Sequence, residues 1–209
     1  SCQLWRALSK AWRVLSPLME GEHGFRVICH EGPLESLLAD LTAHRLDLVL
    51  SSSAVPADSG IKAFNHLLGE SELAFFAVPE LAQKLRRGFP QSLDHAPMLM
   101  PTERSAARRV LEAWFEKLGI TPAIVAEFDD SALIKTFGQQ GVGVFIAPAA
   151  IEEAIVDQLG VMEIGRVPEL RGRYFAISTE RRIKHPAVAM ITAAARNDLF
   201  SAAPSPRRP

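Results

Sequence analysis

The stretch from Phe128 to Pro148, FDDSALIKTFGQQGVGVFIAP, constrains the fold more than any other part of the 209-residue chain. Asp130 or Ser131 can accept hydrogen bonds from the first N–H groups of a helix, because the apolar residues between positions 133 and 137 keep helical spacing. Three glycines between positions 138 and 143 then allow a tight turn into Val142–Ala147, which has the composition of a strand buried on both faces. The stretch predicts a capped helix, a turn and a buried strand.

The same alternation of strand and helix patterns runs along most of the chain and predicts an α/β protein with mainly parallel sheets. The expected strands are Phe25–Cys29, Leu46–Leu50, Ile61–Leu68, Leu73–Val78, Met98–Met100, Ala123–Phe128, Val142–Ala147, Val161–Ile164 and Tyr174–Ser178. The expected helices are Glu31–Arg45, Leu81–Arg87, Thr102–Leu118, the helix after Asp130, Ile151–Leu159 and Pro186–Phe200. The local pattern starts afresh at Leu73–Val78 and at Gly165–Pro168, so we expect the chain to cross between two subdomains there.

Composition excludes several classes of protein. The chain has 23 basic and 24 acidic residues, so no overall field favours nucleic acid. No apolar run reaches the roughly 20 residues of a membrane span, and the first residues lack the apolar core of a signal peptide. Cys2 and Cys29 have no metal-ligand spacing, which favours a reducing compartment, and Cys29 is predicted to be a core residue. We therefore expect a cytoplasmic protein without membrane contact.

The sequence offers no catalytic constellation. The six histidines show no paired spacing for a metal site or a Ser/His/Asp triad. The glycines from Gly138 to Gly143 follow a helix and precede a strand, the reverse of the order in a dinucleotide-binding loop. We expect no catalytic residue, no metal and no cofactor, and hence a protein that is not an enzyme.

Candidate binding residues lie after three of the expected strands, in Ser51–Ser53, Pro101–Ser105 and Phe128–Ser131. Ligands of open α/β sheets bind beyond the carboxyl ends of the strands, although each of these polar residues alone also suits a helix cap or a turn. A helix N-terminus here would attract a small anion. The carboxylates of Glu31, Glu35, Asp129 and Asp130 would instead suit a hard cation, if the fold brings them together.

Several blocks of sequence resemble one known family. They include ESLLADLTAHRLDLVLSSS, MLMPTERSAARRVLEAWFEKLGI, EFDDSALIKTFGQQGVGVFIAP and ERRIKHPAV. Together they resemble the effector-binding domain of LysR-type transcriptional regulators over about Ala7–Phe200. LTAHRLDLVL, EFDDSALIKTFG and ERRIKHPAV resemble in particular a branch that activates sodium/proton antiporter genes.

The resemblance implies a two-subdomain, periplasmic-binding-protein-like (type 2) α/β fold with two crossover segments. Residues 1–72 and 170–200 would form the first subdomain and residues 73–169 the second, followed by a disordered tail, 201–209. A small-molecule or ion effector would bind in the cleft between the subdomains. The positions that match the family's effector-binding residues are Ser9, Lys10, Ser51, Ser52, Thr102, Asp129, Asp130, Ser131 and Phe145. Glu35 matches an acidic position linked to sodium response.

The resemblance also implies partners. DNA would be contacted only through a winged helix-turn-helix that these 209 residues do not include. The chain would form a homodimer or tetramer, in which Lys10–Met19 and Phe25–Cys29 of one copy meet Ala106–Leu118 of another. The departure of Ser1–Arg6 from the family's first strand leaves Ser9 and Lys10 less securely matched. A solute-binding receptor of a transporter is the alternative with the same fold.

Overall fold

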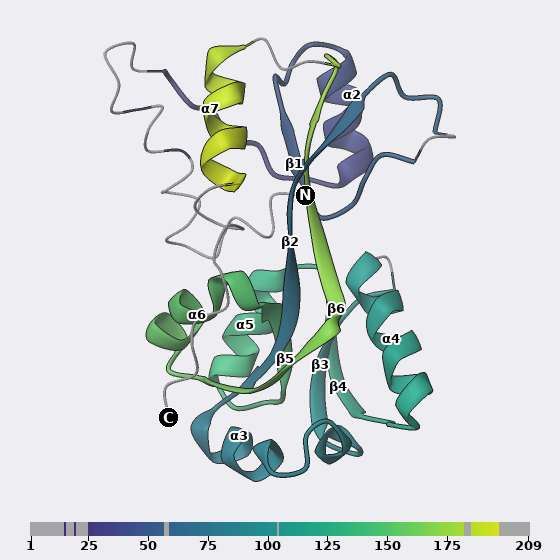
Figure 1. Ribbon diagram of the computed structural model, residues 1–209, viewed down its shortest axis with the longest axis vertical. Coiled ribbons are helices and arrows are strands. Elements are labelled where there is room, and N and C mark those ends of the chain that lie inside the picture. Colours follow the sequence, from purple (N-terminus) through teal and green to yellow (C-terminus); the bar gives the residue numbers. More distant parts are fainter. Residues whose placement is uncertain are drawn as a thin grey trace. The chain divides into compact units, whose positions relative to one another are not determined.

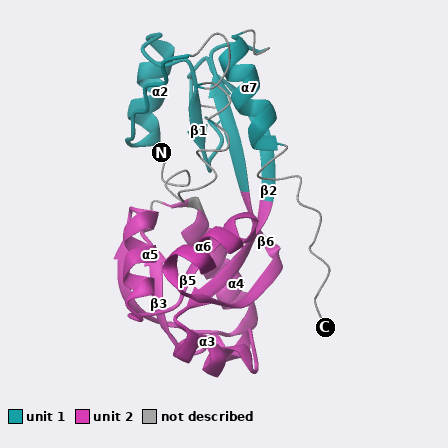
Figure 2. Ribbon diagram, turned by 90° about the vertical axis from the view of Figure 1, so that its left-hand side faces the viewer, with its two compact units in different colours: residues 1–70, 173–209 teal, residues 71–172 magenta. Residues whose placement is uncertain are grey.

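The computed structural model describes residues 15, 19, 25–56, 59–103, 105–181 and 185–196 and divides the chain into two compact units. Unit 1 comprises Ser1–Glu70 and Arg173–Pro209, and unit 2 comprises Ser71–Gly172 (Figure 2). The chain passes from unit 1 to unit 2 within strand β2 (Phe64–Ala77) and returns within strand β6 (Met162–Ser178) (Figure 1). β2 and β6 are hydrogen-bonded neighbours, so the two crossover segments are paired strands.

Unit 1 packs two helices against the ends of the crossover strands. Strand β1 (Val49–Ser51) pairs antiparallel with β6, and Val49 lies opposite Ile177. Helix α2 (Leu34–Thr42) buries the leucines of its apolar face against these two residues. Helix α7 (Pro186–Ala194) packs instead against Tyr174 and Ala176 of β6. The leucine spacing of α2 therefore directs one face of the helix into the core.

Unit 2 contains the remaining strands and helices. Strands β3 (Pro97–Pro101) and β4 (Ala123–Phe128) are parallel, and β5 (Phe145–Pro148) pairs antiparallel with β2. The helices are α3 (Pro79–Arg86), α4 (Ala106–Leu118), α5 (Ser131–Gln139) and α6 (Glu152–Leu159), with short 3-10 helices η2 (Gln91–Leu93) and η3 (Ala149–Ile151). Met98 and Val144 form a parallel bridge that connects β3 to the segment before β5.

The core of unit 2 is built around Phe75 of β2, which is fully buried. Its ring centroid lies 5.6 Å from that of Trp114 on α4 and 5.6 Å from that of Phe89. Aromatic pairs at such distances add to the free energy gained from burying their area. The crossover strand β2 therefore supplies the centre of the unit 2 core.

Local signals in the sequence are confirmed where they set the ends of elements. β4 has the predicted limits, Ala123–Phe128. α4 ends at Gly119, which adopts the left-handed conformation with φ of 67°. Of the two caps expected for α5, Asp130 is the one that accepts the hydrogen bond. Glycine suits the end of α4 because it adopts the left-handed conformation without steric cost. Aspartate suits the start of α5 because its carboxylate accepts a hydrogen bond from a free N–H of the first turn.

The predictions that divided β2 and β6 are wrong. Ile61–Leu68 and Leu73–Val78 were expected as separate strands, but β2 continues through Gly69-Glu70-Ser71. Val161–Ile164 and Tyr174–Ser178 likewise belong to the single strand β6, which includes Gly165–Pro168. A glycine weakens a strand but does not end it when both neighbouring segments keep their pairing.

The expectation of mainly parallel sheets is also wrong, because β1 pairs antiparallel with β6 and β5 pairs antiparallel with β2. Residues 25–29 form no strand, although Phe25 and Val27 alternate with the exposed Arg26 and Ile28. Cys29 is exposed rather than a core residue, since it lies in this irregular segment.

Three predicted helices are shorter than expected. α4 begins at Ala106 rather than at Thr102, because the side chain of Ser105 accepts a hydrogen bond from the N–H of Ala107 and caps the helix. α2 begins only after Pro33, since a proline disfavours helical conformation in the residue before it. α7 ends at Ala194, and residues 197–200 of the expected helix lie outside the described residues, as does the predicted tail.

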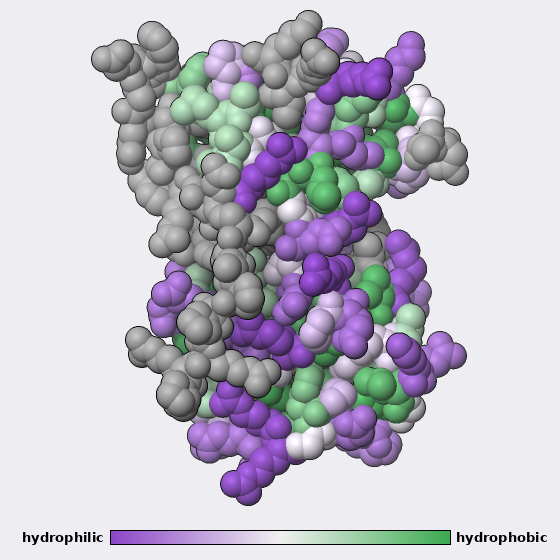
Figure 3. All heavy atoms as spheres, viewed as in Figure 1, coloured by the Kyte–Doolittle hydropathy of each residue, from purple (hydrophilic) through white to green (hydrophobic). Residues whose placement is uncertain are grey.

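The described surface mixes polar residues with separate apolar ones. The face in Figure 3 shows hydrophilic side chains interspersed with smaller hydrophobic areas in each unit. Among the described residues, no helix combines the length and apolarity needed to cross a bilayer.

A tight contact between α5 and β5 gives a test of the unit 2 core. A Cβ atom at Gly138 would lie 2.2 Å from Cδ1 of the buried Phe145. Alanine favours a helix by about 1 kcal/mol over glycine, whereas overpacking of a core costs roughly 1–3 kcal/mol. We therefore expect Gly138→Ala to lower the free energy of unfolding by up to about 2 kcal/mol in urea denaturation.

The matched control for this variant is Gly32→Ala, because a Cβ atom there makes only an ordinary contact of 3.9 Å with Leu37. A Gly138→Ala chain about 1 kcal/mol more stable than wild type, the full gain in helix propensity, would show that Phe145 moves aside at no cost.

Candidate functional site

Polar side chains gather at the carboxyl ends of the two parallel strands of unit 2. Pro101, the last residue of β3, lies opposite Phe128, the last residue of β4. The backbone N–H of Thr102 donates to the carbonyl of Phe128 at 3.1 Å, and its hydroxyl donates to Oδ1 of Asp129. The strand ends thus bring together two predicted residues that are 27 positions apart.

Asp130 and Ser131, the two residues that follow Asp129, lie at the start of helix α5. Asp130 has extended backbone angles, and its Oδ1 accepts a hydrogen bond from the N–H of Ala132 at 2.7 Å. Ser131 is the first helical residue and is half-buried. We call Thr102, Asp129, Asp130 and Ser131 the strand-end group. It combines carboxylate and hydroxyl oxygens with the partial positive charge of a helix N-terminus.

Lys135 is a neighbour of this group that sequence reasoning missed. It is half-buried on α5, four residues after Ser131, so the two share one face of the helix. Burial lowers the pKa of Lys135, while the nearby negative charge of Asp130 partly opposes that shift. Its position four residues after Ser131, at the start of a predicted helix, was the sequence signal that could have placed Lys135 beside this group.

Arg108 supports the strand-end group from α4. Arg108 is 6% exposed, and its guanidinium donates to the carbonyl of Pro101 at 3.0 Å and to Oε1 of Glu127 at 2.9 Å. A third hydrogen bond reaches Glu112 at 2.5 Å. Burial acts against the charge, but hydrogen bonds to Glu112 and Glu127 leave the pKa of Arg108 above its ordinary value. Arg108 thus fixes the residues immediately before Thr102 and Phe128.

Phe145 lies deeper than the strand-end group. Its side chain is fully buried and stacks on Phe76 with ring centroids 5.7 Å apart. It also fills the space left by the missing side chain of Gly138 on α5. Its observed contacts therefore belong to the core that supports α5.

The predicted residues of unit 1 lie on β1 and α2. Ser51 is 6% exposed, and its hydroxyl accepts a hydrogen bond from the N–H of Ser53 at 3.0 Å, which is a turn contact. Ser52 and Glu35 are exposed, and Glu35 occupies the first turn of α2. Ser9 and Lys10 lie outside the described residues.

The four carboxylates expected around a cation belong to different units. Glu31 and Glu35 are in unit 1, whereas Asp129 and Asp130 are in unit 2. Within the described part of the chain, no three His, Cys, Asp or Glu side chains are grouped so that they could hold a metal ion. Each unit by itself therefore holds only two of the four carboxylates.

These observations first define a class of protein. Two α/β units joined by paired crossover strands, with polar groups at the ends of parallel strands, are typical of periplasmic-binding-protein-like (type 2) ligand-sensing domains. The model of the family described as "LysR substrate binding domain" matches residues 7–199. The chain belongs to this family and is the effector-binding domain of a LysR-type transcriptional regulator.

Known relatives agree with this assignment. The chain is 34% identical over 186 residues to the transcriptional activator protein NhaR of Escherichia coli (strain K12), covering 89% of this chain and 60% of that protein. It therefore spans about three-fifths of the length of this relative. Since the family and this relative are regulators, the transporter receptor expected as the alternative loses its support.

Two solved structures share the fold. DarR of Vibrio fischeri, in complex with DNA, superposes with a TM-score of 0.66 and 17% identity, covering 93% of this chain and 64% of that chain. The effector binding domain of QuiR, in complex with shikimate, superposes with a TM-score of 0.62 and 14% identity, covering 91% of this chain and 90% of that chain. At these identities the likeness establishes the fold alone.

Proposed function

We propose that this domain senses a small effector or sodium and thereby controls transcription of genes such as that of a sodium/proton antiporter. The observation that carries the proposal is the strand-end group, since Thr102, Asp129, Asp130 and Ser131 meet where α/β sheets bind ligands. The 34% identity to NhaR supports the choice of regulated gene.

The strand-end group suits a polar molecule with both donors and acceptors. Asp129 and Asp130 accept hydrogen bonds, whereas the N-terminus of α5 and the half-buried Lys135 attract negative charge. A hydroxycarboxylate satisfies both requirements, because its hydroxyls donate to the aspartates and its carboxylate faces the lysine. QuiR, which binds shikimate, is a relative in fold with a ligand of this class.

Sodium is the second candidate, and Glu35 is its proposed sensing residue. Glu35 is exposed on the first turn of α2, where its charge also complements the helix dipole. A hard cation prefers several oxygen ligands, and Glu35 supplies at most two. The support for sodium is therefore the similarity to NhaR rather than a coordination shell.

In either case the effector acts by favouring one arrangement of the two units over another. It can do so only through different affinities for the two arrangements, typically worth about 1–3 kcal/mol of coupling. The crossover strands β2 and β6 are the covalent route by which such a change reaches both units. A DNA-binding domain outside these 209 residues would read the result.

We also propose that the domain pairs with a second copy through the outer face of α4. Val110 on α4 is 42% exposed, and Ile28 in the irregular segment 25–30 is 64% exposed. Segment 25–30 has a strand-like alternation and is paired with no strand in the part of the chain that the structure describes. In a two-fold symmetric dimer, α4 of one copy would contact segment 25–30 of the other, and the same contact would occur a second time with the copies exchanged.

The choice between the two effectors is testable by calorimetric titration at constant ionic strength. Choline salts of shikimate and related hydroxycarboxylates are compared with sodium chloride. We expect a hydroxycarboxylate to bind and Lys135→Gln to weaken it about tenfold, the effect of losing one charge-assisted hydrogen bond. Lys117→Gln, at an exposed lysine of α4, is the matched control and should bind normally.

Sodium sensing is tested in the full-length regulator with a reporter gene. Glu35→Gln should reduce the sodium-dependent change in transcription by several-fold while circular dichroism shows an intact fold, because it removes one carboxylate charge from an exposed helix turn. Glu153→Gln, at an exposed position of α6, is the control. An unchanged sodium response in Glu35→Gln would exclude Glu35 as the sensor.

The proposed pairing predicts a dimer in sedimentation at micromolar concentration. Val110→Asp should raise the dissociation constant of the dimer at least tenfold, because pairing would bury a carboxylate that has no partner in the interface. Met190→Asp, on α7 at 39% exposure, introduces the same charge elsewhere and should leave the dimer intact. A wild-type chain that sediments only as a monomer would contradict the proposal.

A further inference from the structure

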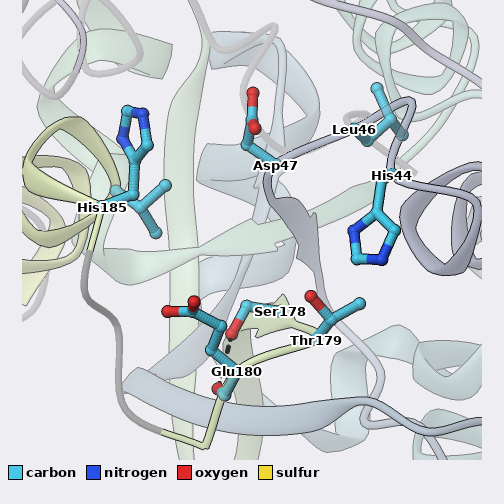
Figure 4. Close-up of a pocket in the computed structure, with 8 residues that line it drawn as sticks. His44, Leu46, Asp47, Ser178, Thr179, Glu180 and His185 are labelled. Atoms are coloured by element: carbon cyan, nitrogen blue, oxygen red, sulfur yellow. Dashed lines mark hydrogen bonds between the residues drawn. The ribbon is translucent and has the colours of Figure 1, made fainter.

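Unit 1 contains a pocket of about 200 Å³ that includes none of the predicted effector residues. Three segments line it: the loop between α2 and β1, the end of β6 and the start of α7. The lining residues are His44, Leu46, Asp47, Ser178, Thr179, Glu180, His185 and Val188. Figure 4 shows the side chains of the seven labelled residues coming from these segments. All eight belong to unit 1.

The walls of the pocket are held by specific hydrogen bonds. The hydroxyl of Ser178 donates to the carbonyl of Glu180 at 2.9 Å. Because this proton is committed, Nε2 of His66 is the donor in its 2.9 Å contact with the Ser178 hydroxyl oxygen. Ser178 is 5% exposed, so its hydrogen bonds with His66 and Glu180 fix the turn after β6 from the buried side. The wall that this turn forms is therefore preformed in the absence of a ligand.

The opposite wall is fixed by the turn that follows α2. His44 adopts a positive φ of 56°, which reverses the chain at the end of the helix. The backbone N–H of Arg45 donates to the carbonyl of Asp40 at 2.8 Å, and its guanidinium contacts Oδ1 of Asp40 at 2.5 Å. These bonds position His44 and Asp47 at the mouth of the pocket, so the second wall is also preformed.

The lining has the chemistry of a site for a small cation with an aliphatic part. Asp47 contributes a carboxylate, and no lysine or arginine lines the pocket in the part of the chain that the structure describes. The Ser178 oxygen keeps acceptor capacity, and Thr179 adds a hydroxyl. Leu46 and Val188 provide apolar surface, and Val188 is 5% exposed.

The volume sets the size of the ligand. At about 30 Å³ per water molecule, the pocket holds roughly six waters. A short aliphatic amine or diamine of about six non-hydrogen atoms has a similar size. A metal ion does not fit the observations, because no three His, Cys, Asp or Glu side chains among the described residues are grouped as ligands.

From this geometry we infer a second binding site, in unit 1, that takes a small aliphatic ammonium compound. The ammonium group is held by Asp47 and the neighbouring oxygens, and the carbon chain lies on Leu46 and Val188. The site shares no residue with the strand-end group of unit 2. The domain would then bind a second ligand in addition to its effector.

The test is a calorimetric titration of the 209-residue chain with 1,4-diaminobutane as the probe, at constant ionic strength of about 0.15 M. We expect saturable binding that Asp47→Asn weakens by about tenfold, as for the loss of one charge-assisted hydrogen bond. Asp157→Asn removes the same charge from an exposed position of α6 in unit 2 and should bind like wild type.

A second readout is the set of backbone amide resonances. The diamine should shift those of residues 44–47 and 178–180, and Leu46→Trp, which fills the pocket, should abolish these shifts. No binding at millimolar diamine, or equal binding by wild type and Asp47→Asn, overturns the inference. Tighter binding of acetate than of the diamine, or equal displacement by sodium chloride, overturns the assigned ligand class.

Discussion

The pairing of two long strands, β2 and β6, is the constraint on which both units depend. Each strand contributes buried residues at both ends, so neither unit can complete its core without them. β2 supplies the fully buried Phe75 and Phe76 to unit 2, whereas β6 supplies Tyr174 and Ala176 to unit 1. The antiparallel partners β1 and β5 then extend the ladder, one in each unit.

The strand-end group depends on a second constraint, the buried charge of Arg108. A buried guanidinium is tolerated only when it is paired and hydrogen-bonded, and Arg108 meets this condition through Glu112, Glu127 and the carbonyl of Pro101. The same bonds hold the ends of β3 and β4 side by side. The charged network is thus the physical support of the site, although it contains no residue of the strand-end group.

The two sites differ in electrostatic character, which suggests different ligands. The strand-end group balances two aspartates against Lys135 and a helix N-terminus, so it suits a molecule with donors and an anionic part. The pocket of unit 1 has the carboxylate of Asp47 and no lysine or arginine among its described lining, so it suits a cation. A regulator with both sites could respond to two chemical conditions through one pair of crossover strands.

The sequence alone determined features that depend on a few neighbouring residues. A cap at Asp130 or Ser131, the end of α4 at Gly119 and the polar segments after the strands followed from helix periodicity, capping and residue size. Tertiary structure decided the continuity of β2 through Gly69-Glu70-Ser71, the antiparallel pairing and the position of Lys135. A strand's limits and direction depend on partners distant in sequence, and burial of a lysine depends on what packs around it. Those contacts exist only once the chain has folded.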